Sequence, residues 1–195
     1  MPSKVADPPI RRWTLAEYYR AGEEGYFDRR RVQLIRGEVV DMPPHGHLHY
    51  LTLYYAKQAM DELFGPGFWV RMQGPVNVAD DSAPEPDIAV VRGEPPQHTD
   101  HPTTALLVIE VSHTTLARDR KLDRLYAAAG VPEYWILDVR RRQLELHRHP
   151  VADAAVPDGF RYAEKRVLDA NEYIAPLALP GKGILVSSLF PPPKD

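Results

Sequence analysis

Residues 106–112 read Leu106-Leu107-Val108-Ile109-Glu110-Val111-Ser112, an aliphatic run that a single glutamate interrupts. A run that is aliphatic on both faces is typical of a strand in the interior of a covered sheet. Because side chains alternate across a strand, Glu110 shares a face with Val108 and Ser112, near the carboxyl end of the strand. A carboxylate among aliphatic side chains is costly unless a cation is near. We therefore expect Glu110 to face a metal ion or a basic side chain.

The sequence on either side of this run predicts further helices and strands. Thr14 and Glu17 have the spacing of a capping box, and apolar residues at intervals of three and four mark two more helices. Helices are expected from 14 to about 22, 49 to 64 and 122 to 129, and strands at 31–35, 38–42, 68–78, 87–91, 105–111, 133–139, 143–148, 160–166 and 184–186. This order predicts an α/β fold, with a mixed sheet flanked by helices, an N-terminal helix and hairpin, and extra C-terminal strands.

The composition is that of a globular protein without thiol chemistry. A chain of 195 residues suits a single domain over 1–195, and the proline-rich residues 1–12 and 191–195 are expected to be flexible tails. The absence of cysteine excludes thiolate ligands and thiol nucleophiles, so any metal must be bound by oxygen or imidazole. Apolar runs are strand-sized, too short for a signal peptide or a membrane span, which predicts a cytoplasmic protein with no membrane partner. A net charge of -3 argues against binding nucleic acid by bulk electrostatics.

A second acid, Asp87, is predicted to stand at the start of a neighbouring strand. The preceding Pro86 has no amide to give to a ladder and fixes the approach of Asp87. Carboxylates from two neighbouring strands suit Mg²⁺ or Mn²⁺, which prefer oxygen ligands. Nine residues beyond Ser112 lies Lys121, one position before the apolar stripe of the next helix. We expect Lys121 to point back at the two carboxylates.

Ordered matches over roughly residues 14 to 149 resemble one protein family. The matching segments are Leu34-Ile35-Arg36-Gly37-Glu38-Val39-Val40-Asp41-Met42, Pro43-Pro44, His49, Pro86-Asp87, Glu110-Val111-Ser112, Asp119, Lys121, Tyr126 and Gly130-Val131-Pro132-Glu133-Tyr134-Trp135-Ile136-Leu137-Asp138. They resemble the Uma-two family (Uma2) of bacterial proteins, formerly described as a domain of unknown function, in the PD-(D/E)XK nuclease superfamily. Two positions depart from the pattern: Ser112 stands where the superfamily has a lysine, and Gln33 stands where family members often carry an acid.

The resemblance implies a restriction-endonuclease-like fold and a metal-dependent endonuclease that hydrolyses phosphodiester bonds of DNA, expected to act as a homodimer. It implies that Mg²⁺ or Mn²⁺ is bound by Asp87, Glu110 and the backbone carbonyl of Val111. Glu38 is then a candidate for a further ligand or for orienting water, and Lys121 supplies the catalytic cation that Ser112 does not. His49 is expected to contact phosphate or to position Glu38, and Ser112 to lie beside the metal ligands.

Other interpretations stay open. Glu110 alone is compatible with a structural salt bridge to Lys121 or Arg124. Ser112 keeps open a nuclease-fold module that binds nucleic acid or protein without turnover, and a hydrolase of a smaller phosphate ester is a third possibility because the fold does not fix the substrate. His45, His47 and His49 suggest zinc. That interpretation is disfavoured, because the histidines lie between two prolines and a helix with no fixed carboxylate evident nearby.

Overall fold

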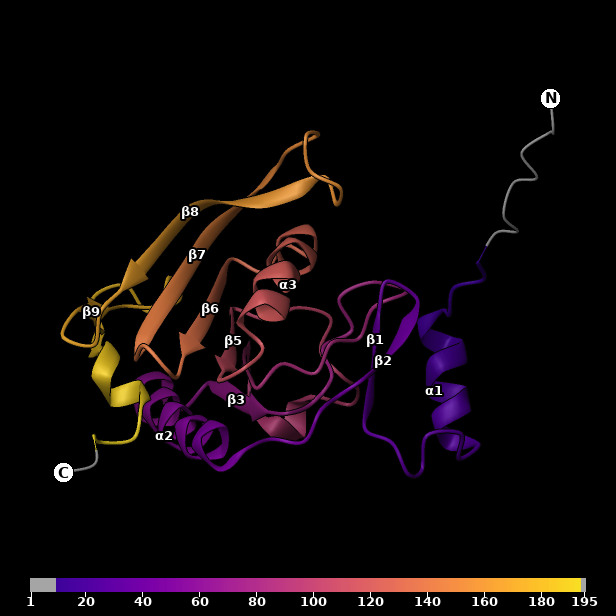
Figure 1. Ribbon diagram of the computed structural model, residues 1–195, viewed down its shortest axis with the longest axis horizontal. Coiled ribbons are helices and arrows are strands. Elements are labelled where there is room, and N and C mark those ends of the chain that lie inside the picture. Colours follow the sequence, from indigo (N-terminus) through magenta and orange to yellow (C-terminus); the bar gives the residue numbers. More distant parts are fainter. Residues whose placement is uncertain (1–9, 194–195) are drawn as a thin grey trace.

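The computed structural model describes residues 10–193, and these form helices on both faces of a sheet (Figure 1). The helices are α1 (Leu15–Glu23), α2 (His47–Phe64) and α3 (Leu116–Ala128), with 3-10 turns η1 (Pro95–Gln97) and η2 (Val186–Leu189). The strands are β1 (Val32–Ile35), β2 (Glu38–Asp41), β3 (Phe68–Met72), β4 (Ile88–Arg92), β5 (Leu107–Ser112), β6 (Glu133–Asp138), β7 (Gln143–Ala152), β8 (Phe160–Leu168), β9 (Tyr173–Ile174) and β10 (Ile184–Leu185). The predicted α/β class is confirmed.

The main sheet has the strand order β3-β4-β5-β6-β7-β8. Its neighbouring strands are antiparallel except β5 and β6, which are parallel and are connected through α3. A parallel pair needs such a crossover, because its two strands run in the same direction. β5 lies inside the sheet and all six of its residues are buried, as its aliphatic sequence predicts.

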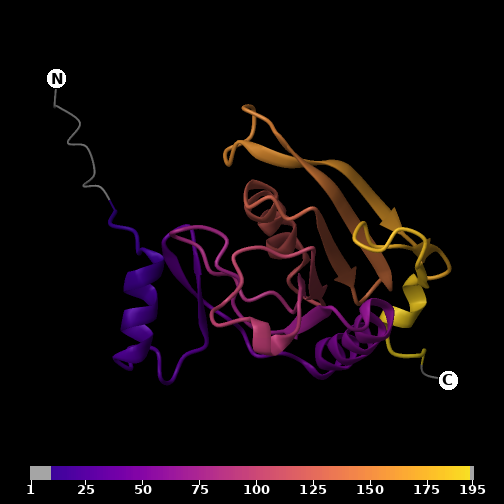
Figure 2. The ribbon, with the colours of Figure 1, turned by 180° about the vertical axis from the view of Figure 1, so that it is seen from behind.

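Alternation along the strands divides the core between the two faces of the sheet. One face packs against α2 and η2, where Leu53 and Met60 of α2 contact strand residues such as Ile109. The other face packs against α3, where Leu122 and Tyr126 lie in a cluster with Val108 and other strand residues. Figures 1 and 2 show the C-terminal segment around η2 lying beside α2. Both faces of the sheet are therefore covered, one by α2 and η2 and the other by α3.

The β1–β2 hairpin and α1 form a smaller cluster at one end of the molecule (Figures 1 and 2). The hairpin turn places Arg36 at φ 50° and Gly37 at φ 72°. A Cβ on Gly37 would lie 2.4 Å from the Cβ of Arg12, so glycine is required there for space as well as for conformation. Leu34 forms a β-bridge with Ala83, which connects the hairpin to the segment before β4.

Several boundaries differ from the sequence prediction, among them those of α3, β3 and β8. α3 begins at Leu116, six residues before the predicted start at 122, because its first turns are polar and show no apolar stripe. The predicted strand at 68–78 ends at Met72, and the residues after it form loops and an isolated bridge. β8 is nine residues long and pairs along β7, so it is more than the short strand expected.

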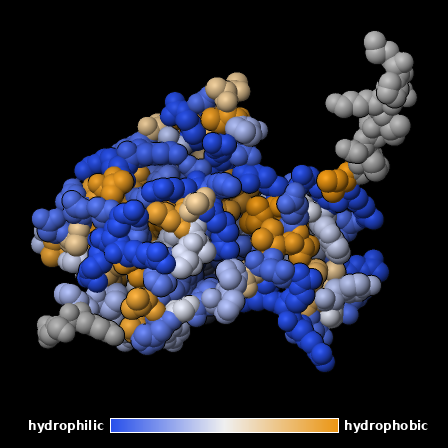
Figure 3. All heavy atoms as spheres, in the orientation of Figure 1, coloured by the Kyte–Doolittle hydropathy of each residue, from blue (hydrophilic) through white to orange (hydrophobic). Residues whose placement is uncertain are grey.

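The predicted flexible tails are only partly within residues 10–193. Arg12 donates to the carbonyl of Arg36 at 2.6 Å, and Arg142 donates to the carbonyl of Pro191 at 2.7 Å, so both ends of the described chain are hydrogen-bonded to the fold. The rest of those tails, residues 1–9 and 194–195, lies outside the described residues. In the part of the chain that the structure describes, no helix combines the length and the apolar character needed to cross a bilayer. Figure 3 shows hydrophobic residues gathered between α3 and the hairpin on an otherwise largely hydrophilic face.

Candidate active site

Strand pairing brings Asp87 and Glu110 together at the ends of two interior strands, where β4 begins and β5 finishes. Ile88 pairs with Ile109, so Asp87, just before β4, lies opposite Glu110 on β5. The backbone N–H of Val111 donates to Asp87 Oδ2 at 2.8 Å, and the backbone N–H of Asp87 donates to Glu110 Oε2 at 3.3 Å. Each carboxylate is thus fixed by the backbone of the other segment, and both side chains are buried.

A third acid, Asp119, comes from the first turn of α3. Its carboxylate is buried and accepts a hydrogen bond from the hydroxyl of Thr115 at 2.5 Å. From the same helix, the Tyr126 hydroxyl donates to Glu110 Oε1 at 3.2 Å. From the sequence, Asp119 is only a matching position of the family pattern and not a predicted site residue. The helix macrodipole favours an acid in the first turn of a helix, and this preference could have singled out Asp119. The sequence predicts that the helix begins at 122, so Asp119 falls outside it.

No basic side chain balances the charge of Glu110 among the described residues. Among residues 10–193 no lysine or arginine forms an ion pair with Glu110, so the structural salt bridge to Lys121 or Arg124 is not found. Burial raises the pKa of Glu110 well above its ordinary value, and Asp87 and Asp119 raise it further. Burial also raises the pKa of Asp119. Buried carboxylates on one cavity wall suit a hard divalent cation, which lowers the cost of ionising them.

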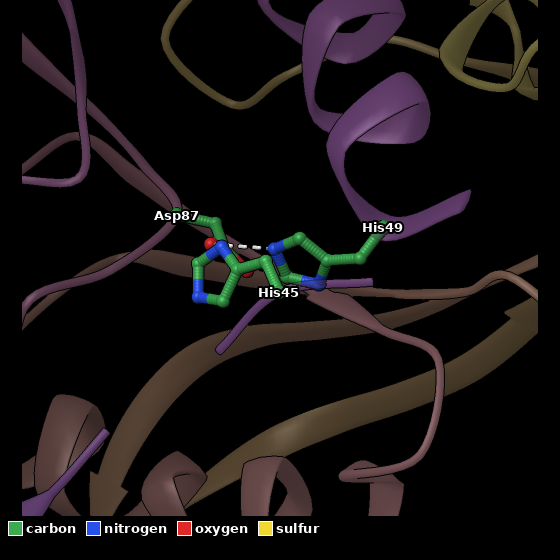
Figure 4. Close-up of side chains that lie close together, drawn as sticks. All are labelled: His45, His49 and Asp87. Atoms are coloured by element: carbon green, nitrogen blue, oxygen red, sulfur yellow. Dashed lines mark hydrogen bonds and ion pairs between the residues drawn. The ribbon is translucent and has the colours of Figure 1, made fainter. Parts of the chain in front are cut away.

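Two histidines at the start of α2, His45 and His49, lie beside Asp87 (Figure 4). His49 Nε2 lies 3.1 Å from Asp87 Oδ1, and the ring centroids of His45 and His49 are 4.1 Å apart. One ligand atom from each of His45, His49 and Asp87 lies within 4.8 Å of the others. From the sequence, zinc binding by His45, His47 and His49 is disfavoured because no fixed carboxylate is evident nearby. That reason is wrong, since the fold places Asp87 against them.

Apart from Tyr126, these groups line one cavity of about 90 Å³. The three acids, His45, His49 and the carbonyl-bearing Val111 contribute to its wall, and so does Arg118 of α3. Burial lowers the pKa of His45, and His49 lowers it further, so this imidazole is neutral near pH 7. The cavity thus combines carboxylate oxygens, neutral imidazole nitrogen and one guanidinium.

The remaining predicted residues are placed differently. Lys121 and Arg118 are both exposed, but only Arg118, about one turn earlier on α3, lies on the cavity wall. Glu38 has an exposed side chain that pairs with Arg12 at 2.9 Å on the hairpin, away from the cavity. His49 therefore contacts Asp87 and does not position Glu38.

The two sequence departures also have defined places. Ser112 is buried, and its hydroxyl lies 3.5 Å from that of Thr115. Gln33 lines the cavity, and its side-chain carbonyl accepts from the backbone N–H of Glu85 at 3.0 Å. Ser112 therefore lies beside the first turn of α3 and Gln33 lies on the cavity wall. Neither side chain adds a charge to the site.

Comparisons with known proteins show the family and the fold of the chain. The model of the family Uma2, described as "Putative restriction endonuclease", matches residues 15–187. A solved structure from Anabaena variabilis, described as "a putative nuclease belonging to DUF820", superposes with a TM-score of 0.72 at 15% identity. That superposition covers 93% of this chain and 98% of the other, and at such low identity it supports the fold alone. No curated protein matches the chain.

Proposed function

Because this chain belongs to the Uma2 family and has a nuclease-like fold, we propose that it hydrolyses phosphodiester bonds of DNA with a divalent metal ion. The observation that carries the proposal is the pairing of Asp87 with Glu110 across β4 and β5, with no basic partner for Glu110 among residues 10–193. Buried acids without a counter-charge are costly in a purely structural role. They are expected where a cation binds.

In the proposed site, Asp87, Glu110 and the backbone carbonyl of Val111 hold Mg²⁺ or Mn²⁺. When bound, such an ion lowers the pKa of a coordinated water and neutralises charge on a phosphodiester. The chain's own contribution is to fix the ligand directions: the N–H of Val111 holds one oxygen of Asp87, and the Tyr126 hydroxyl holds one oxygen of Glu110. Asp119 adds a third carboxylate that is positioned to accept a proton from water within the same cavity.

The sequence predicts Lys121 as the catalytic cation, and the geometry favours a different residue. Arg118 lines the cavity and its Nε lies 3.5 Å from Asp119 Oδ1, whereas Lys121 is not among the residues that line it. We therefore propose Arg118 as the group that contacts the substrate phosphate, with Lys121 as the competing assignment. A guanidinium suits this role because it binds phosphate in a bidentate manner and stays charged.

A nuclease-fold binding module without turnover is the second candidate. Two observations favour it: Ser112 replaces the superfamily lysine, and Lys121 does not reach the carboxylates.

A homodimer would suit cleavage of two strands, and light scattering in solution would measure the oligomeric state. A hydrolase of a smaller phosphate ester is the third candidate, because the net charge of -3 is unfavourable for tight DNA binding.

The decisive experiment is cleavage of plasmid DNA in Mg²⁺ or Mn²⁺ by the wild type, by Glu110→Gln and by the control Glu164→Gln, a β8 residue remote from the cavity. We expect Glu110→Gln to lose at least about a hundredfold in rate and the control to cleave like the wild type. Single-stranded DNA, RNA and bis-p-nitrophenyl phosphate serve as parallel substrates. Wild-type inactivity on every substrate would support the binding module, and activity on the small ester alone would support the third candidate.

A further inference from the structure

The segment that enters α2 carries two imidazoles on one side. His45 lies just before Gly46, the extended N-cap residue of α2, and His49 lies in the first turn. Their rings are 4.1 Å apart, although four positions and the start of a helix separate them. His47, between them, is exposed and is not on the cavity wall. The chain therefore turns two of three histidines inward and leaves the third as a natural control.

Asp87 divides its two oxygens between two neighbours. Oδ2 accepts the backbone N–H of Val111 at 2.8 Å, on the Glu110 side. Oδ1 faces His49 Nε2 at 3.1 Å, on the α2 side (Figure 4). Because each oxygen has more than one lone pair, Asp87 is able to serve ligands on both sides at once.

The side-chain amide of Gln73 marks a position where lone pairs of His45 and Asp87 converge. Its Nε2 lies 2.9 Å from His45 Nδ1 and donates to Asp87 Oδ1 at 3.4 Å. Gln73 has φ 49°, an unusual backbone conformation for a residue other than glycine. With the amide as donor, His45 Nδ1 is an acceptor, so its lone pair and that of Asp87 point to one common position. A metal ion uses the same lone pairs.

We propose that His45, His49 and Asp87 form a binding site for a transition-metal ion such as Zn²⁺ or Co²⁺, beside the carboxylate site for Mg²⁺ or Mn²⁺. This site goes beyond the proposed function and is connected to it only by the shared ligand Asp87. Two imidazole nitrogens and one carboxylate oxygen are a donor set that zinc and cobalt prefer, whereas Mg²⁺ prefers oxygen and retains water.

The distances suit such an ion with small movements. Ligands at ~2 Å from a tetrahedral zinc ion lie ~3.3 Å from one another. The Asp87–His49 pair is already at 3.1 Å, and all three ligand atoms lie within 4.8 Å, so a side-chain rotation of His45 and displacement of the Gln73 amide would complete the set. Three protein ligands leave one position of a tetrahedral ion for water, the arrangement found in catalytic zinc sites.

The test measures metal binding and needs no enzymatic activity. Zn²⁺ affinity is measured by competition with a chromophoric chelator, and Co²⁺ binding by its visible absorption, in the full chain. We expect His45→Ala and His49→Ala each to weaken Zn²⁺ binding at least about fiftyfold and His47→Ala to leave it unchanged, since removing a ligand costs far more than removing a surface imidazole. Gln73→Glu replaces the amide donor with a carboxylate at the converging position and should tighten Zn²⁺ binding at least tenfold.

Two results would overturn the site. If His45→Ala and His49→Ala bind Zn²⁺ like the wild type, or if His47→Ala loses as much as they do, the binding belongs to surface histidines. Thermal melts followed by circular dichroism establish that the variants are folded, and His45→Asn replaces His45→Ala if the latter is not. The proposed nuclease function is tested apart from this, because Glu110→Gln should abolish Mg²⁺-dependent cleavage while retaining most Zn²⁺ binding.

Discussion

The backbone N–H of Val111 donates to Asp87 Oδ2 at 2.8 Å, so β5 orients the acid that precedes β4. The neighbouring Glu110 returns the contact by accepting from the backbone N–H of Asp87. This reciprocal arrangement fixes two carboxylates on adjacent strands without a basic side chain on Glu110.

Asp87→Asn and Glu110→Gln should each weaken Mn²⁺ binding at least about tenfold, because each removes a charged ligand while preserving the side-chain shape. Isothermal titration calorimetry measures the affinity. Asp61→Asn, on the exposed side of α2, is the matched control and should bind like the wild type. Unchanged affinity in both site variants would reject the carboxylate centre.

Removal of divalent metal should leave the chain folded. The two faces of the sheet pack separate hydrophobic clusters against α2 and α3, so the core does not depend on one ion as that of a zinc finger does. Added Mn²⁺ should raise the melting temperature through binding to the native state alone. Circular dichroism with and without chelator measures both effects, and loss of the folded spectrum in chelator would contradict the prediction.

Arg118→Ala and Lys121→Ala distinguish the two candidate cations on α3. Arg118 lines the cavity, so its removal should lower the rate of DNA cleavage about a hundredfold through lost charge stabilisation, while metal affinity changes little. Lys121 is exposed, and its removal should change the rate by less than about threefold. Single-turnover cleavage measures the rates. The opposite order would restore the assignment to Lys121.

Glu133→Gln should destabilise the fold by about 3 kcal/mol, because it breaks a buried pair and leaves a cation without its partner. Glu133 is fully buried and accepts from Arg148 Nε at 2.7 Å, from Trp135 Nε1 at 2.8 Å and from the backbone N–H of Leu177 at 2.7 Å. Urea denaturation measures the free energy of unfolding. Glu172→Gln, in an exposed pair, is the control, and equal stability of both variants would show that the buried pair contributes nothing.

Asp138 should make stability depend on pH in the acidic range. Burial acts to raise its pKa, but hydrogen bonds from the Arg141 side chain and backbone outweigh burial and hold the pKa below its ordinary value. A carboxyl whose pKa is lowered by folding stabilises the protein above its unfolded pKa of about 3.9 and loses that contribution as the pH falls through the folded pKa. Asp138→Asn should therefore be less stable than the wild type at pH 7, with the difference shrinking below about pH 4. Urea midpoints at both pH values check this, and a constant difference would contradict it.

The sequence by itself determined most of the elements and singled out the two acids that the fold pairs. The aliphatic run around Glu110 predicted a buried strand, and Pro86 placed Asp87 at a strand start, because both are local properties of spacing and backbone chemistry. The hairpin turn at Arg36 and Gly37 was also readable, since it requires positive φ angles. These features depend on neighbours in the chain, so they survive without knowledge of the tertiary fold.

Only the tertiary structure decided which distant groups join that pair. His49 and Asp87 are 38 residues apart, and no local pattern states that the start of α2 meets the start of β4. The same is true of Arg118 and Lys121: they are three positions apart on α3, and which one faces the cavity depends on where the helix begins and how it packs on the sheet. At about 100° per residue, Arg118 and Lys121 differ by only about 60° in direction around the helix axis, so the packing of α3 on the sheet decides which of them faces the cavity.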